Sequence, residues 1–162
     1  MMKFNTWEFV SGGPADTERI GRIIGLEMHG GEVVDLIADL GGGKTTFVRG
    51  LVRGVGSDSH VSSPTFKICN TYEVKDSDPG RPSRVYHFDL YRLNEAGILV
   101  DELAEVLEDN KAVVVAEWSK SVQSILPEKR LSIKFSAKSE QTRSLEVSWP
   151  EPLDYLMKGL DQ

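Results

Sequence analysis

The chain has 162 residues, the length of a single compact domain that buries a hydrophobic core without disulfide or metal staples. Hydrophobic residues make up 40% and charged residues 27%, which argues against global disorder, and the net charge of −6 argues against strong non-specific binding to nucleic acid. The single cysteine, Cys69, excludes an internal disulfide and a zinc site built from cysteines, and no apolar run approaches the ~20 residues that span a bilayer. We therefore expect one cytoplasmic domain over residues 1–162, with no membrane partner.

Hydrophobic periodicity and turn residues divide the chain into strands and helices. The first half predicts a strand at Thr6–Val10, a helix at about 14–28, a strand at Glu32–Ala38 and a helix at Thr46–Val52. The second half predicts strands at Phe66–Val74 and Arg84–Asp89 around an exposed connection at Lys75–Ser83, a helix at Glu95–Leu107, a strand at Lys111–Ala116, a hairpin of Leu131–Phe135 with Ser144–Trp149, and a terminal helix at Pro152–Leu160. This order predicts an α/β fold with a mixed sheet flanked by helices.

The most informative segment lies between the second strand and the second helix. It reads Ala38-Asp39-Leu40-Gly41-Gly42-Gly43-Lys44-Thr45 and matches the phosphate-loop pattern except for its first glycine. Glycines let backbone N–H groups curl around phosphate oxygens, and the helix that follows directs its positive end at the same anion. Lys44 is suited to reach the outer phosphates and the Thr45 hydroxyl to ligate Mg²⁺. Ala38 fits this loop if its φ is negative. The alternative is a flexible glycine turn without a ligand.

A phosphate loop works with a carboxylate at the end of a neighbouring strand, where ligands bind in open α/β sheets. Asp89 and Glu117 both end apolar strands; their structural alternatives are a helix cap for Asp89 and a surface ion pair for Glu117. We interpret His87 as a packed or hydrogen-bonded residue rather than a catalytic base. Asp35, inside a central strand, is interpreted as lying near the exposed strand end, with a partnered buried carboxylate as the alternative.

Four motifs occur in a characteristic order: Ala-Asp-Leu-Gly-Gly-Gly-Lys-Thr-Thr-Phe (38–47), Ser-Pro-Thr-Phe (63–66), Tyr-His-Phe-Asp-Leu-Tyr-Arg-Leu (86–93) and Glu-Trp (117–118). From Thr17 to about Trp149 the chain resembles the TsaE (YjeE) family of bacterial ATPases, which serve the threonylcarbamoyladenosine modification of tRNA beside the anticodon. The resemblance implies a P-loop NTPase-like fold, ATP and Mg²⁺ as cofactors, and ATPase activity that is weak in the chain alone. It also implies the TsaB and TsaD proteins as partners, through which tRNA is reached indirectly.

The resemblance also implies roles for individual residues. Thr45 and Glu117 would hold Mg²⁺, and Asp89 would act in hydrolysis together with Lys44. The expected contacts to ATP are Thr17, Asp39, Leu40, Gly41, Gly42, Gly43, Lys44, Thr45, Thr46 and Arg143. We further predict that Trp118 is partly exposed beside the nucleotide, with core packing as the alternative.

Two other functions share the phosphate loop. A small-molecule kinase needs an acceptor pocket and an arginine-bearing lid, for which Lys75–Ser83 with Arg81 and the adjacent Arg84 is the candidate segment. A nucleotide-gated adaptor would bind ATP without turnover. Release of phosphate from ATP, or its transfer to an acceptor, separates the three.

Overall fold

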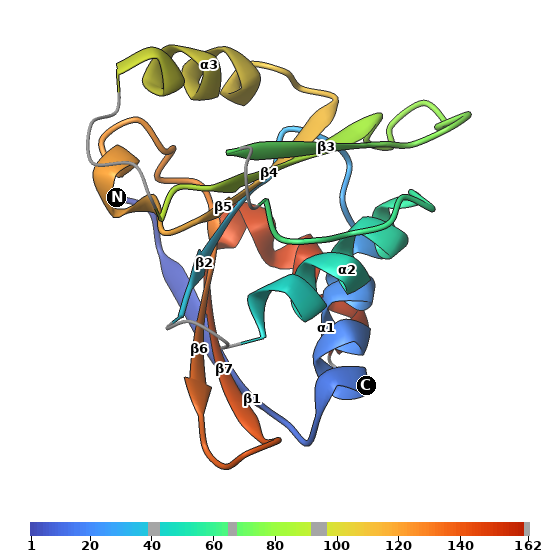
Figure 1. Ribbon diagram of the computed structural model, residues 1–162, viewed down its shortest axis with the longest axis vertical. Helices are drawn as coiled ribbons and strands as arrows, with labels where there is room; N and C mark the ends of the chain where they lie inside the picture. The colour runs from blue at the N-terminus through green and yellow to red at the C-terminus, as the bar shows by residue number, and fades with distance from the viewer. Residues whose placement is uncertain (39–42, 65–67, 92–96, 161–162) are drawn as a thin grey trace.

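A computed structural model describes residues 1–38, 43–64, 68–91 and 97–160. These residues form one mixed sheet of seven strands in the order β1-β7-β6-β2-β5-β4-β3 (Figure 1). The strands are β1 (Phe4–Ser11), β2 (Val33–Ile37), β3 (Cys69–Glu73), β4 (Arg84–Asp89), β5 (Ala112–Glu117), β6 (Leu131–Ala137) and β7 (Arg143–Pro150). The predicted α/β fold with a mixed, helix-flanked sheet is confirmed.

The middle of the sheet is parallel. β2 pairs with β5 on one side and β6 on the other, and β5 pairs with β4, all in parallel register. β7 and β3 run antiparallel to their neighbours β6 and β4. Because the register aligns Leu36 with Glu117 and Glu117 with Asp89, the carboxyl ends of the three central strands meet at one edge. That edge is where an open α/β sheet binds its ligand.

Helices cover the two faces of the sheet unequally. The helices α1 (Pro14–Leu26) and α2 (Lys44–Val55) and the 3-10 helix η2 (Glu151–Leu160) pack on one face and enclose the larger hydrophobic core. α3 (Gly97–Leu107) and the short 3-10 helix η1 (Ser119–Val122) pack on the other, over a smaller core. Val113 and Val115 of β5 pack in the larger core and Val114 packs in the smaller one. The valine run of β5 is therefore buried on both faces of the sheet, as predicted.

Four glycines bring α1 and α2 into backbone contact. A Cβ added at Gly21, Gly25, Gly50 or Gly54 would overlap a backbone carbonyl oxygen of the facing helix. Gly50 faces Glu18 and Gly54 faces Arg22, so residue numbers increase together and the two helices are parallel. Their N-terminal ends therefore lie at the same end of the pair.

Arg81 ties together the opposite ends of these two helices. Its Nη1 donates to the carbonyl oxygens of Leu26 and Met28 at 2.7 and 2.6 Å, after the last turn of α1. Its Nη2 donates to those of Gly54 and Val55 at 3.1 and 3.3 Å, at the end of α2. A cation at two helix C-termini donates to carbonyl groups that have no partner within the helix. Its positive charge is also attracted to the partial negative charge at the C-terminal end of each helix dipole.

Element boundaries differ from the sequence prediction mainly at the ends. The terminal segment is a 3-10 helix, and η1 was not predicted at all. Phe66 and Glu95, where a strand and a helix were expected to begin, lie outside the described residues. Within the described ranges, none of the helices has both the length and the apolar character needed to cross a membrane.

Candidate functional site

A cavity of about 310 Å³ opens where the N-terminal ends of α1 and α2 meet the turn between β6 and β7. It brings together four residues that the sequence predicts as nucleotide contacts: Thr17, Gly43, Thr46 and Arg143. Thr17 is almost fully buried, and its hydroxyl is held by a 2.7 Å hydrogen bond with the hydroxyl of Ser11. Two positive helix ends and one guanidinium line this space together with the exposed Glu140, so its positive groups outweigh the one carboxylate of its lining and favour an anion.

Gly43, at the end of the phosphate loop, lines this cavity, while Asp39, Leu40, Gly41 and Gly42 lie outside the described residues. Gly43 caps α2 with a φ of 96°, a left-handed conformation that favours glycine. Among the non-glycine residues that the structure describes, only Asp76 and Trp118 have a positive φ. Ala38 therefore has the negative φ that lets alanine replace the first glycine of the loop.

Lys44, the first residue of α2, is buried near Trp118, which directly follows β5. Its Nζ donates to the carbonyl oxygen of Ala38 at 3.3 Å and lies 4.0 Å from the centre of the Trp118 ring. A cation over an indole face is stabilised by the ring quadrupole. Trp118 itself is partly exposed, as predicted, while its ring also packs on Tyr91 and on the smaller core. Its φ of 58° marks a sharp turn directly after Glu117.

Glu117 presents an unsatisfied carboxylate oxygen at the carboxyl edge of the sheet. The residue is 2% exposed, so the surface ion pair considered from the sequence is wrong. Its Oε2 lies 3.3 Å from Nε2 of His87, but its Oε1 is buried and has no hydrogen-bond partner among the described residues. Thr45, the other predicted Mg²⁺ ligand, shares a 2.7 Å hydrogen bond with the hydroxyl of Ser63. No cluster of three His, Cys, Asp or Glu side chains able to hold a metal occurs in the described ranges.

Asp89 and His87 occupy the neighbouring strand. Asp89 is paired with Glu117 in register, and its Oδ1 accepts the backbone N–H of Tyr91 at 3.1 Å, which fixes the carboxylate at the strand end. His87 is fully buried beside Tyr72, which confirms that it is a packed histidine. Burial raises the pKa of the Cys69 thiol to about 11, so the one cysteine is a poor nucleophile at neutral pH.

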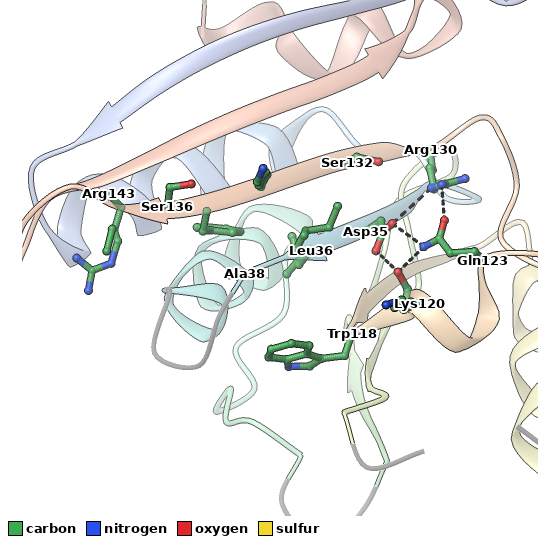
Figure 2. A pocket seen from close by; sticks show the side chains of 15 residues that line it. Asp35, Leu36, Ala38, Trp118, Lys120, Gln123, Arg130, Ser132, Ser136 and Arg143 are labelled. Atoms are coloured by element: carbon green, nitrogen blue, oxygen red, sulfur yellow. Dashed lines mark hydrogen bonds and ion pairs between the residues drawn. The ribbon is translucent and has the colours of Figure 1, made fainter. Parts of the chain in front are cut away.

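The interpretation of Asp35 as a strand-end residue near solvent is wrong, and the alternative of a partnered buried carboxylate holds. Asp35 is 1% exposed. Its Oδ1 accepts a hydrogen bond from the Ser119 hydroxyl at 2.5 Å. Its Oδ2 accepts one from Nε2 of Gln123 at 3.2 Å and lies 3.6 Å from Nε of Arg130 (Figure 2). Because Arg130 also donates to Oε1 of Gln123 at 2.8 Å, this network joins β2, which leads into the phosphate loop, to η1, which follows Glu117 and Trp118.

The arginines proposed for a lid have structural roles instead. Arg81 bonds the ends of α1 and α2, and Arg84 bonds Asp109 at 3.0 Å and lies 3.7 Å from Glu73. The sequence also left two features unrecognised, the glycine crossing and the double role of Arg81, and it did not identify the partners of Asp35. The glycines had a readable signal, since Gly21 and Gly25, like Gly50 and Gly54, are spaced four residues apart.

Comparison with known proteins agrees with the geometry. A family model described as "Threonylcarbamoyl adenosine biosynthesis protein TsaE" matches residues 12–145. The tRNA threonylcarbamoyladenosine biosynthesis protein TsaE of Treponema pallidum is 34% identical over 139 residues, covering 86% of this chain and 98% of that protein. The protein of the same name from Bacillus subtilis is 32% identical over 146 residues, covering 89% of this chain and 85% of that protein.

A solved structure leads to the same conclusion. The crystal structure of Bacillus subtilis YdiB superimposes with a TM-score of 0.69 at 26% sequence identity, over 99% of this chain and 96% of that one. Because the family model spans most of the chain and the relatives are matched over most of their own length, the chain belongs to the TsaE family.

Proposed function

We propose that this protein is a magnesium-dependent ATPase that acts with the TsaB and TsaD proteins in the threonylcarbamoyladenosine modification of tRNA. Membership of the TsaE family supports the pathway. The ATPase activity, the cofactors ATP and Mg²⁺, and the two partners are the proposed part. In this proposal the chain is a single ATPase domain in the cytoplasm, weakly active alone, and tRNA is reached through the partners.

The observation that carries the proposal is the cavity at the paired N-terminal ends of α1 and α2. Thr17, Thr46 and Arg143 line it, and Gly43 joins it to Lys44. Helix N-termini and a guanidinium stabilise negative charge, and the phosphates of a nucleotide supply that charge. A nucleotide bound here would place its phosphates beside Lys44.

The residues at the strand ends fit a hard divalent cation. The buried Oε1 of Glu117, which lacks a partner within the described chain, and the hydroxyl of Thr45 are the kind of oxygen ligand that Mg²⁺ prefers. With two protein ligands at most from this pair, the remaining ligands would be phosphate oxygens and water. When bound, the ion would neutralise charge on the phosphoryl group that leaves ATP.

Lys44 and Asp89 would divide the remaining work. Charge-assisted hydrogen bonds to phosphate contribute about 1.5–3 kcal/mol, more than the roughly 0.5–2 kcal/mol of a cation–π contact, so ATP would draw the Lys44 ammonium away from the Trp118 ring. Asp89, held at the end of β4 by the N–H of Tyr91, would orient the attacking water and accept its proton.

The kinase alternative loses its candidate lid, because Arg81 and Arg84 are engaged in helix capping and ion pairs. In the adaptor alternative the protein binds ATP in the same site but does not hydrolyse it. A phosphate-release assay with ATP and Mg²⁺, on the chain alone and with TsaB and TsaD, separates these functions.

We expect phosphate release that rises when both partners are added. Glu117→Gln should lower this release and raise the Mg²⁺ concentration that gives half-maximal release, because a carboxylate ligand is lost. Glu146→Gln, an exposed carboxylate on β7, serves as the matched control and should leave both unchanged. Phosphate transfer to a nucleoside or metabolite would favour the kinase, and ATP binding without release in the complex would favour the adaptor.

A further inference from the structure

A second and larger cavity lies on the open face of the sheet. The strand β6 alternates between Leu131, Ile133 and Phe135, which are buried beneath α1 and α2, and Ser132, Lys134 and Ser136, which face the other way. Lys134 and Ser136 are exposed, and so is Ile37 at the end of β2, at 47%. A cavity of about 920 Å³ lies along this face between β6 and η1.

We name this cavity the basic cleft, after the four cations that line it: Lys120, Arg130, Lys134 and Arg143. In Figure 2, Arg130 stands at one end and Arg143 at the other, with Trp118 on the facing wall. The one carboxylate of the lining is Asp35, so the lining carries a net charge of +3 in a chain whose net charge is −6.

Arg130 pairs with Asp35 inside the cleft, but the two lysines of the cleft are not neutralised by an acid of its lining. Asp35 is buried and engaged by Ser119, Gln123 and Arg130. Lys120 and Lys134 are exposed, and neither has an acidic group within 4.0 Å in the part of the chain that the structure describes. Two exposed cations on a concave surface focus an attractive potential for anions.

The cleft is also partly apolar. Ile37, Ala38 and Ala137 lie among its lining residues, and the ring of Trp118 forms part of its wall. Apolar surface between cations suits a ligand that has both carboxylates and apolar groups. A nucleic acid fits less well, because Lys134 is followed across the sheet by Glu146 and then Glu8 in register. These two acids repel any anion that extends past Lys134, so they favour a short acidic segment over a phosphate backbone that continues beyond the cleft.

We propose that the basic cleft is a docking site for a short acidic segment of a partner protein, with apolar side chains among its carboxylates. The carboxylates pair with Lys120 and Lys134, and the apolar side chains cover Ile37 and the Trp118 ring. The inference does not depend on ATP turnover, because no step of hydrolysis enters it, although Arg143 lines both the cleft and the cavity proposed for the nucleotide.

The test uses a fluorescein-labelled peptide, Glu-Leu-Glu-Glu-Leu-Glu, and fluorescence anisotropy with the full chain at low ionic strength. Lys120→Ser/Lys134→Ser should weaken binding about fivefold or more, and added salt should weaken the wild-type complex. Lys138→Ser/Lys158→Ser removes two exposed lysines outside the cleft and should change affinity less than about twofold. Melting curves of both variants should match that of the wild type, because the four lysines are exposed.

Three results would overturn the proposal. The first is the absence of saturable peptide binding, or an equal loss in the two lysine pairs, which would mean non-specific attraction. The second is displacement of the peptide by excess ADP and Mg²⁺, which would put the peptide in the nucleotide cavity. The third is tighter, lysine-dependent binding of a labelled oligouridylate, which would make the cleft a site for RNA.

Discussion

Replacing Gly50 with alanine should loosen the crossing of α1 and α2. An added Cβ at this position would overlap the carbonyl oxygen of Glu18, and it would lie 2.8 Å from the carbonyl carbon of Glu18 and 3.0 Å from the nitrogen of Arg22. These are backbone atoms within a helix, so they cannot turn aside as the tip of a long side chain can. The two helices must separate to accept the methyl group.

The size of the effect follows from two opposing terms. Overpacking a close contact destabilises a protein by about 1–3 kcal/mol, while alanine in place of glycine within a helix recovers roughly 0.5–1 kcal/mol. The net loss is then about 1–2 kcal/mol. For a chain of this length each kcal/mol corresponds to about 2–4 °C, so Tm should fall by roughly 2–8 °C.

Thermal denaturation followed by circular dichroism measures this change. Gly13→Ala is the matched control, because its Cβ would have no atom within 4 Å and its φ of 170° is extended. That variant should lower Tm less than Gly50→Ala does, because it changes only the N-cap preference of α1 for glycine over alanine and forces no helix apart. A Gly50→Ala protein with an unchanged or raised Tm would refute the reasoning, because α1 and α2 would then accept a methyl group at a contact where the structure leaves no space for it.

Four further predictions concern the site and its frame. Lys44→Ala should weaken ATP binding in calorimetry by about 1.5–3 kcal/mol, and unchanged affinity and turnover would contradict the phosphate-loop assignment. Asp89→Asn should lower kcat while ATP affinity stays within about threefold, whereas equal losses would indicate a metal or structural role. Arg81→Ala should lower the free energy of unfolding in urea by roughly 1–3 kcal/mol, and Arg81→Lys should restore only part of it, because an ammonium lacks the planar fork that bonds both helix ends. Because the folded pKa of Cys69 is about 11 against an ordinary 9.0, its thiolate fraction at pH 8 is about a hundredfold lower than usual; iodoacetamide should label it correspondingly slowly until urea unfolds the chain.

Sequence patterns predicted the parts of this fold that depend on local order. The valine run of β5 and the alternation of β6 each have a period or composition that is typical of one kind of local structure. The parallel register then carried Glu117 and Asp89 to the same edge, as expected for neighbouring strands.

The parts that the sequence did not predict depend on contacts between distant segments. Asp35 is separated from Ser119 by 84 positions, and the burial of its carboxylate is tolerable only because three side chains from beyond β5 converge on it. Arg81 was placed in an exposed connection because its neighbours are polar, yet it bonds carbonyl groups 27 and 53 positions away. The local periodicity of a sequence does not predict contacts between residues so far apart in the chain.

The asymmetric anchoring of the β3–β4 connection has a practical consequence for labelling. Its second half is fixed where Arg81 reaches the helix ends, and Pro82 beside it is buried. Its first half, Lys75 and Asp76, is exposed and turns away from the sheet, and a chain inserted there would leave the guanidinium contacts in place. An affinity tag or a fluorophore at this position would lie beyond the capped C-terminal ends of α1 and α2, at the far end of these helices from the cavity between their N-terminal ends, and so would leave the proposed nucleotide site open.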